Sequence, residues 1–257
     1  MKKTILALST IATLMMSGCT TPTPNHVSND EHKSGVQGEH HKHWNYAENG
    51  PSHWEEFSKT CGVGQHQSPI NILPGKTVSM NHQYDLSMHD NISSVADIID
   101  NGHSIKVTPS QSGTINLNGE TYKLLQFHFH GKSEHTVDGK RYDMVAHMVH
   151  QNQYTKELAV VAVFFEEGDA SPILDTVINN VGKSVKIDPQ DLLPTNETSY
   201  FHYVGSLTTP PCSENVQWYL LKTPMTASKA QIDHFRKFYV DNERPVQEMH
   251  DRVIESR

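Results

Sequence analysis

Two histidines in the middle of the chain have the spacing of metal ligands on a β-strand. In the segment Gln126-Phe127-His128-Phe129-His130, His128 and His130 lie two residues apart, so on a strand their side chains point to the same face. They are then about 6–7 Å apart along the strand, which lets both imidazoles reach one ion. Phe127 and Phe129 take the opposite face and are expected to be buried in a core. Gln126 shares the face of the histidines and could orient one of the rings.

A second candidate strand, Tyr142–His150, offers a third imidazole. His147 and His150 are three residues apart, so they point to opposite faces of a strand and only one of them can join the first pair. If the two strands are antiparallel neighbours, His147 is the natural third ligand. Three imidazoles leave one tetrahedral position open, which is typical of a catalytic rather than a structural zinc site. Such a set favours zinc, although cobalt or copper could bind, and the His-x-His pair alone also occurs as ordinary surface or core histidines.

The rest of the chain has the pattern of a large sheet with few helices. The dipeptide Asn118-Gly119, between two alternating segments, is a strong hairpin signal. The valine-rich run at 158–165 is typical of a strand buried on both faces. Two helices are expected, Ser171–Val181 and Ser228–Tyr239, each beginning with a serine that can cap it. The expected strands are Ser104–Thr108, Gly113–Leu117, Thr121–Phe129, Tyr142–His150, Leu158–Phe165 and Val216–Leu221.

The N-terminus has the layout of an export signal. Lysines at positions 2 and 3 precede a mostly apolar run at 5–16, and small residues stand immediately before Cys19, as in a secretory signal peptide. The string Met16-Ser17-Gly18-Cys19 also resembles a bacterial lipoprotein box in which Cys19 is lipidated, although Met16 stands where that box usually has leucine. An ordinary cleaved signal is the alternative. We therefore expect residues 1–18 to be a signal peptide.

The segment that follows is polar and has no hydrophobic period. Residues 19–42 are interpreted as a lipidated, disordered tether, and residues 43–257 as one globular domain, since no second linker interrupts them. The histidines of the tether belong either to a solvated linker or to a tract that scavenges metal weakly. The formal net charge of the chain is -8, and the absence of a basic patch from the sequence argues against nucleic acid as a partner.

The chain has three cysteines. If Cys19 carries lipid, Cys61 and Cys212 remain, and an oxidising compartment favours their pairing. The alternative is two buried free thiols. A bridge would close a loop of about 150 residues, which the chain-entropy model stabilises by on the order of 4–5 kcal/mol.

Several strings, taken together and in order, resemble the alpha-class carbonic anhydrases. The resemblance extends from His43 to about Arg252 and is specific only as a set. It implies a large, twisted, mainly antiparallel central sheet with a few peripheral helices, a Zn²⁺ cofactor, and a disulfide between Cys61 and Cys212. It also implies the reversible hydration of carbon dioxide to bicarbonate and a proton by metal-bound hydroxide. The strings are His43-Trp44, QSPINI at 67–72, NGH at 101–103, QFHFH at 126–130, SEHTVDGK at 133–140, HMVH at 147–150, LAVVAVF at 158–164, GSLTTPPCSENVQW at 205–218 and RPVQ at 244–247.

The resemblance assigns catalytic roles by position. It makes Thr208 the acceptor of a hydrogen bond from metal-bound hydroxide, Glu134 the acid that orients Thr208, and His103 the proton shuttle. Thr209 lies beside the substrate. The metal ligands are His128, His130 and His147, and the apolar wall for carbon dioxide is Val149, Val160, Leu207 and Trp218.

The resemblance also assigns supporting roles. Tyr46 and Asn101 match groups that order water between the shuttle and the metal. Gln126 and Asn242 match hydrogen-bonding partners of the metal ligands. These partners matter because they fix the tautomer and the orientation of each ring.

Two positions depart from the family pattern. Where the family usually has a glutamate that accepts the far N–H of the third ligand, this chain has Val145, and such a loss typically costs 10–100-fold in metal affinity or activity. We therefore expect weaker metal binding than in relatives. Near the shuttle, Lys106 replaces a neutral amide; we expect it to disturb ordered water or to lower the pKa of His103 by charge repulsion, and to slow proton transfer modestly.

Three functions compete at this point. The first is an active carbonic anhydrase acting on carbon dioxide and bicarbonate, a small-molecule substrate pair. The second is a non-catalytic binding module of the same fold, which usually lacks a zinc histidine, whereas this chain has all three. The third is a zinc-scavenging lipoprotein that uses the histidine-rich tether. In each case we expect an exported protein, periplasmic or at the outer membrane or cell surface, attached to the membrane only through lipid at Cys19, with a homodimer as one allowed state.

Overall fold

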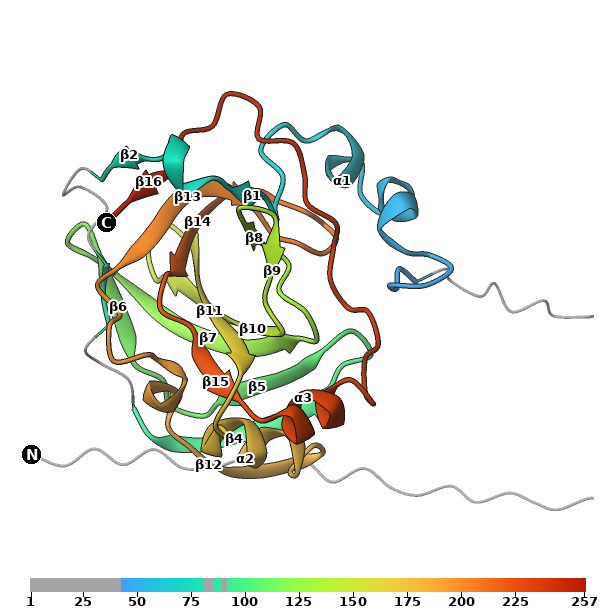
Figure 1. The fold of residues 1–257 in the computed structure, drawn as a ribbon, viewed down its shortest axis with the longest axis vertical. Coiled ribbons are helices and arrows are strands. Elements are labelled where there is room, and N and C mark those ends of the chain that lie inside the picture. Colours follow the sequence, from blue (N-terminus) through green and yellow to red (C-terminus); the bar gives the residue numbers. More distant parts are fainter. Residues whose placement is uncertain (1–42, 81–85, 89–91) are drawn as a thin grey trace, which may run out of the picture. The chain divides into compact units, whose positions relative to one another are not determined.

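A computed structural model describes residues 43–80, 86–88 and 92–257, and residues 42–257 form one compact unit. Within the described residues, one mixed sheet has 13 strands (Figure 1). Its main path, in spatial order, is β12 (Lys183–Ile187), β4 (Ser94–Asp100), β5 (Ile105–Pro109), β7 (Glu120–His130), β10 (Met144–Asn152), β11 (Leu158–Glu167), β14 (Glu214–Leu221), β13 (Tyr200–Ser206), β16 (Glu255–Ser256) and β2 (Val78–Ser79).

The remaining strands lie beside this path or form a second, small sheet. Strand β15 (Met225–Ala227) pairs with β11, and β6 (Thr114–Leu117) pairs with both β7 and β3 (Leu86–Ser87). The second sheet has three strands, β1 (Asn71–Ile72), β8 (Thr136–Val137) and β9 (Lys140–Arg141). Most neighbouring strands of the large sheet are antiparallel; the parallel pairs are β11 with β14, β11 with β15, and β16 with β2. The expected mainly antiparallel sheet is confirmed.

The predicted hairpin at Asn118-Gly119 is confirmed. Asn118 and Gly119 have φ values of 52° and 81°, and a two-residue turn with positive φ at both positions matches the twist of the strands it joins. The turn pairs Leu117 with Glu120 and so sets the antiparallel register of β6 and β7. Strand β7 is thereby placed with its histidine-bearing end in the middle of the large sheet.

The central strands β7, β10 and β11 separate two cores. The core on one face contains Phe127 and Phe129, as predicted, packed with Ala146 and Met148 of β10. The core on the other face contains side chains that alternate with these along the same strands. Its buried members are Ile70, Ile72, Val145, Val149, Val160, Ala162, Phe164, Phe201, Tyr203, Val216, Trp218, Leu220 and Ile254. The run 158–165 is buried on both faces, as its sequence predicts.

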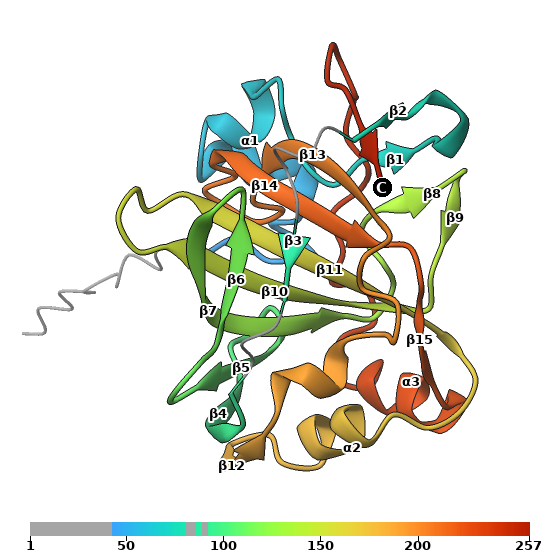
Figure 2. The same ribbon diagram turned by 90° about the vertical axis from the view of Figure 1, so that its left-hand side faces the viewer.

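The helices are short and lie at the margin of the sheet (Figure 2). Helix α2 (Pro172–Ile178) and helix α3 (Lys229–Phe235) begin at the predicted caps, Ser171 and Ser228. Both end earlier than predicted, because the chain leaves the helix through turns after Ile178 and Phe235. The other helical segments are α1 (Thr60–Val63) and the 3₁₀ turns Pro51–Glu56, Pro74–Lys76 and Pro189–Leu192.

Cys61 and Cys212 form a disulfide across 151 residues, which confirms the expected pairing. It ties α1 to the segment before β14. No helix among the described residues is long and apolar enough to cross a membrane. Cys19 and the histidines of the tether lie outside the described residues.

Candidate metal centre

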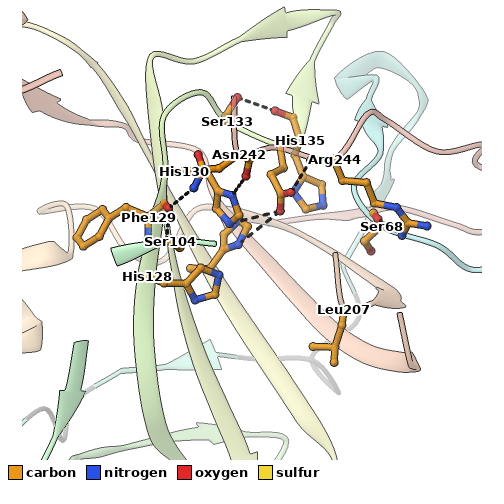
Figure 3. Close-up of polar contacts among 12 residues, drawn as sticks. Ser68, Ser104, His128, Phe129, His130, Ser133, His135, Leu207, Asn242 and Arg244 are labelled. Carbon is orange, nitrogen blue, oxygen red and sulfur yellow. Dashed lines mark hydrogen bonds and ion pairs between the residues drawn. The ribbon is translucent and has the colours of Figure 1, made fainter. Parts of the chain in front are cut away.

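The three predicted ligands converge, because β7 and β10 are antiparallel neighbours. In this pairing His147 stands opposite His128, and His130 follows two residues along β7. The centroids of the three rings are 4.7–5.3 Å apart, and one potential ligand atom from each histidine lies within 4.8 Å of the others. The close-up in Figure 3 shows His128 and His130 on the same side of their strand. His150, in contrast, points away from the trio, and its Nδ1 is 3.0 Å from the carbonyl oxygen of Met148.

Two of the three rings have a partner on the nitrogen that faces away from the other rings. Nδ1 of His128 is 3.0 Å from Oε1 of Gln126, as the sequence suggested. Nδ1 of His130 is 2.5 Å from the backbone carbonyl oxygen of Asn242. Each imidazole therefore donates from Nδ1 and keeps a lone pair on Nε2 for a metal, since neutral imidazole has one donor and one acceptor nitrogen.

His147 differs from the other two. Its Nδ1 lies 3.8 Å from Oε2 of Glu134, and the same oxygen lies 3.6 Å from Nε2 of His130. We therefore assign Nδ1 of His147 to the metal side of its ring. The far nitrogen, Nε2, is buried and has no hydrogen-bond partner among the described residues. Val145, two residues earlier on the same face, is fully buried and has no group that can accept a hydrogen bond.

Burial keeps these imidazoles in the form that binds metal. Desolvation lowers the pKa of His128 to about 3, with smaller contributions from His130 and Lys106. Desolvation also lowers the pKa of His147, and the neighbouring histidines add to the effect. A metal coordinates the deprotonated, neutral ring, so these imidazoles are already in the protonation state that binds a metal ion.

Lys106 acts on a different histidine from the one expected. It stands opposite His128 in the pairing of β5 with β7, and its positive charge helps to lower the pKa of His128. The pKa of His103 is lowered too, but by burial first and by His43 second, against a raising effect of Asp100. The expected repulsion between Lys106 and His103 is thus not among the causes of that shift.

Glu134 lies fully buried beside the trio. Its Oε1 accepts a 2.8 Å hydrogen bond from the backbone N–H of Arg244. Burial raises the pKa of this carboxyl group, while His130, that N–H group and the hydroxyl of Thr208 act to lower it. Thr208 is thus close enough to Glu134 to influence its ionisation.

Sequence reasoning missed the part that Arg244 plays in holding Glu134. The guanidinium of Arg244 is buried and donates to Oε1 of Gln67 at 2.9 Å and to the carbonyl oxygens of Ser68 and Cys61 at 2.8 Å each. These bonds fix the backbone that holds the carboxylate. A signal was present, because Arg244 opens the quoted string RPVQ, but no chemistry was attached to it.

A cavity of about 160 Å³ opens onto the metal side of His128 and His130. It brings together seven of the predicted site residues. His103 stacks on Trp44 at its rim, with ring centroids 3.7 Å apart. The cavity is lined by Trp44, Tyr46, Asn101, His103, Ser104, Lys106, Gln126, His128, His130 and Thr209.

The four residues expected to line an apolar wall pack together beside His147. The ring of Trp218 is 5.0 Å from that of His147, centroid to centroid, and its indole N–H donates to the carbonyl oxygen of Ser206 at 2.9 Å. Thr208 is buried two residues beyond Ser206. The wall residues Val149, Val160, Leu207 and Trp218 all belong to one packed cluster.

The two asparagines of the site shape its backbone. Oδ1 of Asn101 accepts hydrogen bonds from the backbone N–H groups of His103 and Ser104, at 2.9 and 2.8 Å. Nδ2 of Asn242 donates to the carbonyl oxygens of His103 and Phe129, at 3.2 and 3.1 Å. Both asparagines therefore fix the loop that carries His103. The hydroxyl of Tyr46 has its pKa raised by burial and then by the nearby charge of Glu134.

Comparison with known proteins agrees with this geometry. A family model of eukaryotic-type carbonic anhydrases matches residues 49–257. The carbonic anhydrases of Pectobacterium carotovorum and Klebsiella pneumoniae are 40% and 41% identical to this chain over 225 and 228 residues, which cover 82% of this chain and 90% of each relative.

Solved structures of alpha-carbonic anhydrases are similar to this chain as well. The alpha-carbonic anhydrase of Thermovibrio ammonificans, in complex with the inhibitor sulfanilamide, has 38% identity and a TM-score of 0.75 over 83% of this chain and 98% of that one. The alpha-carbonic anhydrase of Photobacterium profundum has 37% identity and a TM-score of 0.76 over 83% of this chain and all of that one. The chain therefore belongs to the alpha-class, or eukaryotic-type, carbonic anhydrase family.

Proposed function

We propose that this carbonic anhydrase hydrates carbon dioxide reversibly at a zinc ion held by His128, His130 and His147. One observation carries the proposal: two hydrogen-bonded strands bring one nitrogen from each of these rings within 4.8 Å of the others. Nε2 of His130 is buried without a hydrogen-bond partner among the described residues, which leaves it available to an ion. Three neutral imidazoles suit zinc, and three protein ligands leave a position open for chemistry.

When bound, zinc supplies a Lewis acid and lowers the pKa of a coordinated water. Residues of the protein must orient the nucleophile. A threonine hydroxyl has one hydrogen to donate. If Thr208 donates it to Glu134, its oxygen can only accept a hydrogen bond from the nucleophile, which orients a lone pair toward the substrate. The backbone N–H of Arg244, 2.8 Å from Oε1 of Glu134, supports the carboxylate form that this arrangement requires.

The substrate and the proton are handled by different groups around the centre. The cluster that contains Leu207 and Trp218 is apolar, and such a surface suits a neutral, linear molecule better than polar groups do. Thr209 lies on the cavity side, where it can contact the substrate. His103 lines the same cavity, and imidazole can take up and release a proton near neutral pH, so we assign it the transfer of protons to solvent.

We also propose that the enzyme works outside the cytoplasm. The disulfide between Cys61 and Cys212 supports export, because such bonds persist in oxidising compartments. Lipidation of Cys19 would then tether the domain through residues 20–42. Mass spectrometry of the membrane-bound protein tests this: a diacylated or triacylated N-terminal Cys19 is expected, whereas a free N-terminus elsewhere would indicate an ordinary cleaved signal.

The decisive experiment is stopped-flow carbon dioxide hydration with purified protein of known metal content. We expect one zinc per chain, activity that is lost with a chelator and restored by zinc, and inhibition by a sulfonamide. Metal-loaded protein that leaves carbon dioxide unhydrated would overturn the proposal. If replacing residues 20–42 by a histidine-free linker removed most of the bound zinc, the scavenging function would be favoured instead.

A further inference from the structure

Two adjacent buried imidazole rings behind the metal centre each have one nitrogen with no hydrogen-bond partner among the described residues. One is Nε2 of His147, and the other is Nδ1 of His135. The two side chains are 1% and 0% exposed, so bulk water does not reach them. Their ring centroids are 6.4 Å apart and the rings are inclined at 75°. Buried polar groups are almost always hydrogen-bonded, so two such atoms in adjacent rings indicate a common partner.

His135 is firmly held on its other side. Its Nε2 is 2.6 Å from the hydroxyl of Tyr203, which is 2.6 Å from Oγ of Ser68. That Oγ accepts a 3.0 Å hydrogen bond from the backbone N–H of Ser206. The ring of His135 also packs against Trp218, at 4.6 Å between centroids, and Trp218 in turn packs against His147. The orientation of His135 is therefore fixed independently of any partner on its Nδ1; Figure 3 shows His135 together with Arg244 and Ser68.

The strand next to this pair offers no acceptor. Val145 stands two residues before His147 on the same face, is fully buried, and carries only methyl groups. Two hydrogen bonds of about 2.9 Å that meet at the near-tetrahedral angle of one water span about 4.5–5 Å between their end atoms. Ring nitrogens of two imidazoles whose centroids are 6.4 Å apart can meet that span. A buried water with two polar partners is the usual way to satisfy such groups.

We propose that one ordered water bridges Nε2 of His147 and Nδ1 of His135, which makes His135 the positioning residue for the third metal ligand. The hydrogen bonds run in one consistent direction. His147 donates from Nε2 to the water, the water donates to Nδ1 of His135, and His135 donates from Nε2 to Tyr203. Nδ1 of His147 then keeps its lone pair for the ion. This inference rests on the proposed zinc site.

A matched pair of substitutions tests the bridge. The side-chain amide of asparagine reaches the place of Nδ1 in a histidine, whereas that of glutamine reaches the place of Nε2. His135→Asn therefore keeps a group for the water and loses Tyr203, and His135→Gln does the opposite. We expect zinc release into a competing chelator to be about 10-fold faster in His135→Gln, the lower end for loss of a supporting partner, and within about twofold of wild type in His135→Asn.

A purely structural role for His135 predicts the reverse order, because the bond to Tyr203 is the one that anchors the ring. Release that is faster in His135→Asn than in His135→Gln, or unchanged in both, would overturn the bridge. If neither variant folds, Tyr203→Phe keeps the ring and its Nδ1 and removes only the anchor; we expect release within about twofold of wild type, and severalfold faster release would assign the effect to the anchor and overturn the bridge. His150→Gln is the control, since His150 is equally buried on the opposite face and should leave release unchanged.

The metal content of the wild type separates this inference from the proposed function. If the wild-type protein holds no zinc, the proposed metal centre itself is wrong. If the wild-type protein holds one zinc but the two His135 variants release zinc at equal rates, only the proposed water bridge is wrong. The apoprotein melting temperatures of the variants, measured alongside, show how much of any change is general destabilisation.

Discussion

The three metal ligands are not equivalent, and the difference lies in the atoms behind them. His128 and His130 each have an oxygen within hydrogen-bond distance of Nδ1. His147 has Val145 where an acceptor is needed, and its Nε2 is unpaired among the described residues. Because such partners fix the tautomer and orientation of a ligand, we expect the site to release zinc chiefly through loosening of His147.

Val145→Glu is expected to slow zinc release. A carboxylate at this position can accept directly from Nε2 of His147, and that hydrogen bond offsets part of the cost of its buried charge. We expect a change of about 10-fold, at the lower end of the 10–100-fold range for such partners, measured by transfer of zinc to a chelator. Val145→Ile, which adds no acceptor, is the control. Equal rates for wild type and Val145→Glu would show that the missing acceptor does not matter.

Removal of a ligand itself should have a larger effect. His128→Ala is expected to lower zinc affinity by more than about 100-fold, the upper limit for loss of a mere supporting bond, and to abolish carbon dioxide hydration. His150→Ala is the control from the neighbouring strand: it removes a buried imidazole on the opposite face, so it should reduce stability but keep one zinc per chain. Full zinc occupancy in His128→Ala would exclude His128 as a ligand.

The ligand trio was predictable because its spacing carries the information. On a strand, a separation of two puts His128 and His130 on one face, and a separation of three excludes His150 once His147 is used. The hydrogen-bonding partners of the ligands were harder to predict from the sequence. Asn242 contributes a backbone carbonyl oxygen to His130, which no side-chain pattern encodes. His135 lies in the family-like string at 133–140, which assigns it no role. Only the folded chain shows that its Nδ1 is unpaired among the described residues.

At the scale of elements, the central strands were predictable and several flanking ones were not. Strands β7, β10 and β11 have clear alternation or a continuous apolar run, and each was expected within a few residues. Strand β4 was missed because its outer face carries Val95 and Ile99, which are 51% and 40% exposed, so polar and apolar residues do not alternate. Strand β12 is a short strand at the end of the sheet with mostly exposed side chains. Pairing with a neighbour, rather than local pattern, makes these segments strands.

The two helices at the sheet margin depend on one glutamine. Oε1 of Gln231 accepts from the backbone N–H groups of Ser171 and Ser228 at 2.9 and 3.0 Å, and its Nε2 donates to the carbonyl oxygen of Ser171 at 2.8 Å. It therefore joins the N-terminal caps of α2 and α3. At about 1 kcal/mol for each bond, Gln231→Ala should lower the free energy of unfolding by about 3 kcal/mol in urea titrations, with zinc content unchanged. Gln153→Ala, an exposed glutamine, should change it by less than about 0.5 kcal/mol; equal effects would contradict the proposed role.

At the scale of the whole molecule, one covalent bond links the segment that carries Thr208 and Thr209 to the start of the domain. The disulfide closes 151 residues of chain. The backbone N–H of Cys212 donates to the carbonyl oxygen of Thr209 at 2.8 Å, and the carbonyl oxygen of Cys61 accepts from Arg244 at 2.8 Å. The bond thus holds both the threonine segment and the arginine that supports Glu134. Sequence alone left open whether these cysteines pair, because only the fold brings their Cα atoms to 5.1 Å.

Loss of this bond should therefore reduce stability more than it reduces metal binding. In the chain-entropy model a loop of this length contributes about 4–5 kcal/mol, so Cys61→Ala should unfold at a clearly lower urea concentration than wild type. None of the three ligands is joined to Cys61 or Cys212 by a hydrogen bond described here, so folded Cys61→Ala should keep one zinc, while the turnover of carbon dioxide falls as the threonine segment loosens. The control is wild type with reducing agent, which should reproduce the variant. If reduction left the urea midpoint unchanged, the disulfide would not be a major source of stability in this enzyme.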